Sequence, residues 1–369
     1  MDLILQGLGT ALPRHSISQH ELAAHAGRIA GQRTPAQTRI LGTLFRMTGI
    51  KRRGSVLLEG NDAGTGQQRM PFYVEAEQAC DRGPTTHERM QRYSQEAGAL
   101  ALVAARQACT ESGILFPEFT HLITVSCTGF FAPGIDVLLI KQLSLSPEIS
   151  RLHVGFMGCH GAINGLRAAN AFAMSDPHAK VLLCAVELCS LHFQYNWNRD
   201  HLVANSLFSD GAAALVVASK NVDNSMNGNP WRIRSTASYL FPDSEDAMSW
   251  KISDHGFEMT LSQRVPDLIA AGLKTWVTRW LESQDLKLPD IKSWAIHPGG
   301  PRILNAVAES LNLCGADMAA SRHILEQNGN MSSPTVIFIL DHLRKTGAST
   351  PCVLLGFGPG LVAEAVLLF

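Results

Sequence analysis

Paired cysteines, metal-ligand clusters and long apolar runs are all missing from this chain of 369 residues. Its eight cysteines are scattered, with no CxxC pair and no zinc-like spacing, so we expect reduced thiols in a cytoplasmic protein without a metal. No uncharged apolar run approaches the roughly 20 residues that cross a membrane. The apolar opening 3–12 lacks a preceding basic segment and ends at Pro13 and Arg14, which argues against a secretory leader.

An excess of charge of either sign is also missing. The 31 Lys and Arg residues balance 32 Asp and Glu residues, which leaves a net charge of −1 and no electrostatic case for a nucleic-acid or membrane-surface partner. Hydrophobic residues make up 46% of the chain, as is typical of a protein with a large buried core. At this length we expect two core-forming halves.

The apolar pattern alternates between strands and helices along the chain. Strands are expected at residues 3–9, 121–126, 152–157, 180–186, 212–218, 233–239, 294–297, 352–357 and 361–369. Helices are expected at residues 18–24, 37–47, 85–113, 133–143, 159–174, 266–281, 302–311 and 332–345. Near-continuous apolar strands between helices predict an α/β fold whose sheet is buried on both faces.

The polar, Asn-rich segment 219–230 is the clearest linker. A related strand–helix order on its two sides indicates an internal duplication. We therefore place an N-terminal half at residues 1–220 and a C-terminal half at residues 230–369.

Cys159 lies where an apolar strand gives way to a helical pattern, between Gly158 and Gly161. The positive end of a helix dipole favours a thiolate, so this cysteine is a candidate nucleophile. The structural alternative is a small buried core residue, the ordinary place of a free cysteine.

Two further candidates follow in the C-terminal half. His297 stands at a strand end before a Pro/Gly turn, and strand ends of α/β sheets are where ligands bind. Asn330 precedes an expected helix, where an asparagine can serve equally as an N-cap. Acyl transfer followed by decarboxylative carbon–carbon bond formation would use this set. The thiolate would hold the acyl group, His297 would pair with the thiolate, and His297 and Asn330 would donate to an enolate oxygen.

Five motifs support this chemistry: GFMGCHGAINGLR around Cys159, SLFSDGAAALVV at 206–217, IHPGGPRIL at 296–304, GNMSSP at 329–334 and GFGPGL at 356–361. On these motifs almost the whole chain resembles the type III polyketide synthases, the chalcone/stilbene synthase-like branch of the thiolase superfamily. The resemblance implies a five-layer αβαβα thiolase-like fold, a homodimer, and no metal, flavin or nicotinamide cofactor. It implies iterative condensation of malonyl-CoA onto an acyl-CoA starter held on Cys159, then cyclisation to a pyrone or phenolic product.

The resemblance also implies individual roles. Cys159, His297 and Asn330 match the family's catalytic set. Phe208 matches a gatekeeper phenylalanine, and Met259 falls where the family has a second one, which would soften that gate. Pro359 matches a turn that shapes the cavity. Arg46 and Arg302 are candidates for CoA binding, with the basic cluster Lys51, Arg52 and Arg53 as a further source of phosphate contacts.

Some positions depart from the plant enzymes. Cys127, Cys189 and His192 stand where chalcone synthases usually carry cavity-lining threonines, and Ala132 stands where they place a methionine that crosses the dimer interface. The pattern is closer to bacterial alkylpyrone or alkylresorcinol synthases, and small residues here predict a tunnel for a long acyl starter.

Three alternatives stay open. A ketoacyl-acyl-carrier-protein synthase III-like enzyme would make a single elongation, but such enzymes typically carry His-Gln-Ala-Asn where this chain has His297-Pro298-Gly299-Gly300. A non-catalytic acyl-binding homologue would have no use for an activated nucleophile. A cysteine hydrolase would release free acid without consuming malonyl-CoA, and the local signatures of such enzymes are missing around Cys159.

Overall fold

A computed structural model describes residues 3–31, 34–60, 68–78, 80–219 and 231–369. Within these residues nine strands form one mixed sheet. In spatial order they are β11 (Ser293–Ile296), β12 (Cys352–Gly358), β13 (Val362–Leu368), β8 (Arg232–Leu240), β1 (Leu3–Ala11), β7 (Asp210–Ser219), β6 (Lys180–Leu188), β4 (His121–Ser126) and β5 (Ser150–Gly155). Among the described residues two pairs, Leu3–Ile233 and Ile4–Arg232, join β1 to β8, so the sheet consists of two half-sheets with a narrow junction.

Helices cover both half-sheets and fill the space between them. The central layer contains α5 (Gly161–Ser175) and α10 (Thr335–Lys345), which share one apolar cluster with the inner faces of both half-sheets. One outer layer contains α3 (Thr86–Ser112) and α4 (Ile135–Leu143), and the other contains α7 (Val265–Glu282) and α8 (Pro301–Leu311). Each outer helix layer packs on its half-sheet through one apolar cluster, and a third cluster joins the central helices to both half-sheets. This arrangement confirms the predicted five-layer αβαβα fold.

Close packing of α3 against β1 follows directly from residue size. A Cβ atom at Gly7 or Gly9 would lie 2.1 Å from a backbone carbonyl of α3, and the facing helix residues Ala104 and Ala108 are fully buried. The helix begins after Thr85, whose side chain forms the expected capping box with Glu88, and ends at Gly113 in the left-handed region.

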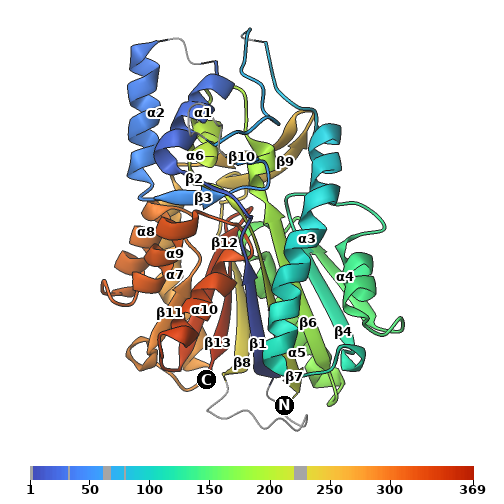
Figure 1. The fold of residues 1–369 in the computed structure, drawn as a ribbon. Helices are drawn as coiled ribbons and strands as arrows, with labels where there is room; N and C mark the ends of the chain where they lie inside the picture. The colour runs from blue at the N-terminus through green and yellow to red at the C-terminus, as the bar shows by residue number, and fades with distance from the viewer. Residues whose placement is uncertain (1–2, 32–33, 61–67, 79, 220–230) are drawn as a thin grey trace.

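Most of the remaining elements gather at one end of the sheet, at the top of Figure 1. They are α1 (Gln19–Ile29), α2 (Pro35–Met47), α6 (Arg199–Leu207), the paired strands β2 (Ser16–Ser18) and β3 (Arg52–Gly54), and the hairpin of β9 (Met248–Ser253) and β10 (Gly256–Leu261). The sequence analysis missed α6, both small sheets and α9 (Ala319–Asn328). These elements are short, and burial against neighbours stabilises them more than their own periodicity does.

The structure corrects one prediction, on the burial of the sheet, and describes only part of another, the linker at 219–230. The sheet is not buried on both faces throughout, because β5 is an edge strand whose side chains are largely exposed. Of the expected linker 219–230, residue Ser219 ends β7 and the rest lies outside the described residues. In the part of the chain that the structure describes, no helix combines the length and apolarity needed to span a bilayer.

Candidate active site

Cys159 lies in a single 3₁₀ turn, Gly158–His160, just before α5, and not in the α-helix itself as expected. The chain turns sharply here, with positive φ angles at Phe156 (60°) and Gly158 (72°). A Cβ atom at Gly158 would lie 2.5 Å from the Pro359 ring, so only glycine lets the turn approach that proline. Pro359 thereby holds the turn that presents the Cys159 sulfur.

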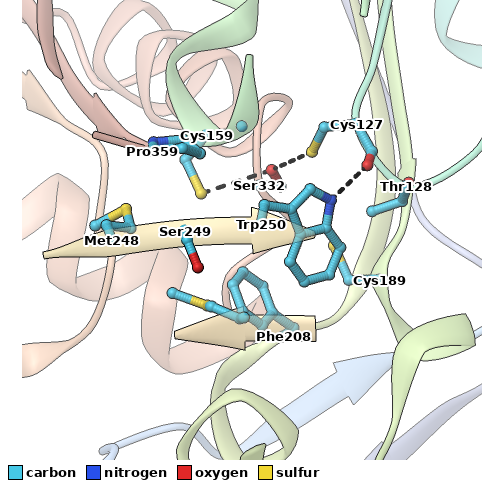
Figure 2. A pocket seen from close by; sticks show the side chains of 12 residues that line it. Cys127, Thr128, Cys159, Cys189, Phe208, Met248, Ser249, Trp250, Ser332 and Pro359 are labelled. Carbon is cyan, nitrogen blue, oxygen red and sulfur yellow. Dashed lines mark hydrogen bonds between the residues drawn. The ribbon is translucent and has the colours of Figure 1, made fainter. Parts of the chain in front are cut away.

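The Cys159 side chain lines a small cavity (Figure 2). Its volume is about 40 Å³, and the other lining residues are Cys127, Thr128, Gly158, Cys189, Phe208, Met248, Ser249, Trp250, Met259, Ser332 and Pro359. Five residues predicted to line or gate a cavity, at positions 127, 189, 208, 259 and 359, are therefore brought together around the sulfur.

Asn330 reaches Cys159 from the opposite half of the chain. Its amide NH binds the Leu207 carbonyl at 2.9 Å, and its carbonyl accepts from the Ser209 amide at 2.9 Å. The side-chain Oδ1 accepts the Ser332 amide at 2.8 Å, which leaves the Asn330 NH₂ group to hydrogen-bond the Cys159 sulfur. Asn330 is not the N-cap of α10, because that helix begins five residues later, at Thr335.

Ser332 is a site residue that the sequence analysis missed. Its hydroxyl donates to the Cys159 Sγ at 3.6 Å and contacts the Cys127 Sγ at 3.3 Å (Figure 2). Its backbone adopts a positive φ of 56°, which is uncommon outside glycine. The second serine of GNMSSP, Ser333, donates to the buried carboxylate of Glu187 at 2.6 Å. The motif marked the segment, but only the turn geometry showed that the two serines face different partners.

His297 follows β11 and is buried, with its backbone amide bound to the Leu355 carbonyl at 2.8 Å. Ala295 of β11 faces the central layer, so His297, two residues on, faces it too. The neighbouring strand β12 presents Gly356 and Gly358 there. Cα and Cβ of His160 pack against Gly356, and its ring packs against Gly358. His297 is thus placed beside the Cys159 turn, and neither of its ring nitrogens has a hydrogen-bond partner among the described residues.

Burial decides the protonation of this pair. Exclusion of water raises the pKa of the Cys159 thiol to about 11, although hydrogen bonds from Ser332 and Asn330 oppose the shift. Burial, with a contribution from His160, lowers the pKa of His297 to about 3. Both shifts favour the uncharged forms, a thiol at Cys159 and a neutral imidazole at His297. Desolvation opposes the effect of the helix dipole that was expected to favour the thiolate.

These directions predict an alkylation profile. Because the Cys159 pKa is raised, the thiolate fraction grows only as pH increases, so the rate of alkylation by iodoacetamide should still rise at pH 9–10. Peptide mass spectrometry of the Cys159 peptide would measure it, with exposed Cys314 as the internal control. A plateau below pH 7 would instead indicate a preformed thiolate–imidazolium pair.

His192 lies behind the cavity and does not line it. Its Nδ1 accepts from the Phe257 amide at 3.0 Å, so Nε2 carries the proton and donates to the Thr128 carbonyl at 2.7 Å. The ring stacks on Phe257 at 4.2 Å and meets the Trp250 ring edge-on at 5.5 Å. His192 supports the cavity wall, and both of its nitrogens are already used.

Trp250, also missed from sequence, closes the cavity. Its indole NH donates to the Cys127 carbonyl at 2.7 Å, and its ring lies 6.5 Å from that of Phe208 (Figure 2). The small side chains at 127 and 189 therefore do not open a tunnel next to Cys159 here, because the indole lies beside them. The hairpin β9–β10 that carries Trp250 has no distinctive motif, which is why the sequence did not reveal it.

A larger cleft of about 650 Å³ lies on the outer side of the Phe208 segment. Leu207 and Leu261 line the cleft, whereas Phe208 and Met259 line the Cys159 cavity. Of the predicted CoA-binding residues, Arg302 lines this cleft. Arg46 does not, although its neighbour Met47 does, and Arg46 is exposed on α2.

The three basic residues at 51–53, predicted as a further source of phosphate contacts, lie in different surroundings. Lys51 forms an exposed ion pair with Glu326 at 2.6 Å, and Arg52 donates to Ser16 at 2.7 Å. Arg53 is 1% exposed and donates to backbone carbonyls, so a phosphate contact from Arg53 is excluded.

The fold that carries Cys159, with Asn330 and Ser332 beside it, matches a known class of enzyme. The family models agree. The model for the chalcone and stilbene synthase N-terminal domain matches residues 2–221, and the model for the C-terminal domain matches residues 232–369. The chain belongs to the chalcone and stilbene synthase family and is a type III polyketide synthase.

Individual relatives are similar over most of their length. An alpha-pyrone synthesis polyketide synthase-like protein of Mycobacterium tuberculosis is 31% identical over 99% of this chain and 90% of its own. A 1,3,6,8-tetrahydroxynaphthalene synthase of Streptomyces peucetius is 33% identical over 73% of this chain and 72% of its own.

Among solved structures, PKS-I of the brown alga Ectocarpus siliculosus superposes with a TM-score of 0.88 at 28% identity, covering 100% of this chain and 98% of that one. The C-terminal type III polyketide synthase domain of a hybrid enzyme from Dictyostelium also reaches a TM-score of 0.88, at 26% identity, covering 100% of this chain and 99% of that one.

Proposed function

We propose that this polyketide synthase loads an acyl-CoA starter on Cys159, extends it repeatedly with malonyl-CoA, and releases a pyrone. The observation that carries the proposal is the Cys159 sulfur under the Asn330 amide, in a cavity separated by Phe208 from a cleft large enough for a pantetheine arm. The name of the mycobacterial relative supports a pyrone product.

In the loading step the Cys159 proton passes to His297, and the sulfur attacks the thioester carbonyl of the starter. The acyl–sulfur bond to Cys159 forms, and CoA leaves as the thiol after taking the proton back from His297. Desolvation of both groups makes their separate ionisation costly, so transfer within the pair is the lower-energy route.

In the extension step malonyl-CoA loses CO₂, and the carbon–carbon electron pair becomes an enolate whose oxygen accepts hydrogen bonds from Asn330 and His297. The enolate carbon attacks the Cys159 thioester and expels the Cys159 thiolate. The extended chain, now on CoA, returns to Cys159 for the next round. Decarboxylation supplies the carbanion, so this sequence of steps uses no redox cofactor or metal.

The surroundings of the site support three further proposals. Arg302 in the cleft would contact CoA phosphates, and exposed Arg46 at its edge would add charge. The exposed edge strand β5, with exposed Leu152, Met157 and Phe130, would pair two copies in a homodimer. Eight free cysteines favour a cytoplasmic location.

We also propose that the boundary between the N-terminal and C-terminal halves of the chain falls within residues 220–230.

Mass spectrometry of products tests this function. Purified enzyme with malonyl-CoA and acyl-CoAs of increasing chain length should yield multiply extended pyrones. Because the Cys159 cavity is only about 40 Å³, short starters should react faster than long ones. A single extension would instead support the ketoacyl synthase III-like alternative, and acylation without condensation would support an acyl-binding homologue. A preference for long starters would contradict the limit that this cavity sets.

A further inference from the structure

Arg53, like Arg89, is a fully buried arginine of the described core that has no role in the proposed reaction. It lies on β3, is 1% exposed, and forms no ion pair with a carboxylate among the described residues. Its Nη1 donates to the carbonyl of Asn205 at 2.9 Å and to that of Phe208 at 2.6 Å. Both carbonyls belong to the C-terminal end of α6, where helix carbonyls lack helical donors and the dipole favours a cation.

The same side chain touches the segment that carries Asn330. A Cβ atom at Gly329 would lie 2.9 Å from both Cγ and Cδ of Arg53, so the aliphatic stem occupies the space that this glycine leaves free. Gly329 has a φ of 74°, which turns the chain from α9 into Asn330. Arg53 therefore packs against the backbone immediately before Asn330 while it holds the carbonyl of Phe208.

These two segments are also joined directly. The Asn330 backbone forms one hydrogen bond to Leu207 and one to Ser209, on either side of Phe208. The position of the Phe208 peptide therefore constrains the backbone of Asn330, whose side-chain amide hydrogen-bonds the Cys159 sulfur.

Burial of the Arg53 guanidinium carries a desolvation cost. Burial lowers the pKa of Arg53 to about 9, opposed by the nearby charge of Asp210. The guanidinium is flanked by the rings of Phe45 at 5.5 Å and Phe193 at 6.0 Å, and its Nε and Nη2 have no partner among the described residues. An apolar side chain would avoid this desolvation, so packing alone does not account for an arginine here.

We propose that Arg53 is a positioning residue that clamps the Phe208 and Asn330 segments together and thereby aligns Asn330 for the decarboxylation step. This inference rests on the proposed role of Asn330. It predicts that loss of the clamp affects malonyl-CoA decarboxylation, which depends on Asn330, more than acylation of Cys159.

The test is a double-mutant cycle of Arg53→Lys and Asn330→Ala, with two readouts. Release of CO₂ from malonyl-CoA reports decarboxylation, and single-turnover intact-mass spectrometry with a short acyl-CoA reports acylation of Cys159. Lysine keeps the charge but loses the planar guanidinium that reaches both carbonyls. We expect Arg53→Lys to lower decarboxylation by about 10- to 100-fold and to change acylation less than about threefold.

In the Asn330→Ala background the same substitution should cause no further loss of decarboxylation, because the residue it aligns is gone. The matched control is Arg106→Lys, an exposed arginine on α3 that donates to the Gln142 carbonyl. Full additivity of the two losses, or an equal fall in both readouts, would overturn the proposal.

If instead the proposed function itself is wrong, the Asn330→Ala substitution alone would leave the rate of malonyl-CoA decarboxylation unchanged. This result distinguishes failure of the proposed function from failure of the Arg53 proposal. Thermal unfolding of each variant verifies the fold. If Arg53→Lys does not fold, Arg53→Gln, whose amide donates to one carbonyl, replaces it in the same cycle.

Discussion

Replacing Cys159 by alanine is expected to lower polyketide formation by at least about 10³-fold, because no other group can carry the acyl chain between extensions. Intact-mass spectrometry should show no acyl adduct after incubation with a starter acyl-CoA. Slow release of CO₂ from malonyl-CoA should persist, since Asn330 and His297 remain in place.

Cys189→Ala is the matched control for this substitution. Cys189 is buried and lines the same cavity, yet has no role in the proposed loading step. The Cys189→Ala enzyme should retain the acyl adduct. Acylation of the Cys159→Ala enzyme at another cysteine, with products still formed, would contradict the assignment of the nucleophile.

Replacing Trp250 by alanine is expected to change the product spectrum more than any other single substitution in the cavity wall. The indole separates the Cys159 cavity from the aromatic stack of His192 and Phe257, with its ring 5.5 and 5.8 Å from theirs. Removing it adds on the order of 100 Å³ beside the sulfur. Longer starters and products with additional extension units should then appear in the mass spectrum of the reaction.

Trp250→Phe separates volume from hydrogen bonding. It keeps a ring in the wall but loses the NH that donates to the Cys127 carbonyl, so its stability should fall by about 1 kcal/mol with little change in product length. Trp250→Ala should cost about 1–3 kcal/mol in the free energy of unfolding, since the side chain is only half-buried. An unchanged product distribution in folded Trp250→Ala would show that the indole does not limit the cavity.

The sequence by itself determined the family, the layered α/β fold and most of the long elements. Buried strands with continuous apolar runs, and helices with capping boxes at Ser18 and Thr85, carry their structure in local residue order. The same holds for the chemistry-bearing motifs around Cys159, His297 and Asn330, because each stands at an element end that local pattern can locate.

Only the tertiary structure decided how these residues act. Ser332, Trp250 and Arg53 gain their roles from partners far along the chain: Cys159, Cys127 and Phe208. No local pattern encodes such contacts. Desolvation is likewise a property of the folded surroundings, which is why a cysteine predicted to favour the thiolate has its pKa raised instead. The cavity volume follows from the same cause, since one indole from a hairpin without a motif occupies the space that small side chains at 127 and 189 were expected to open.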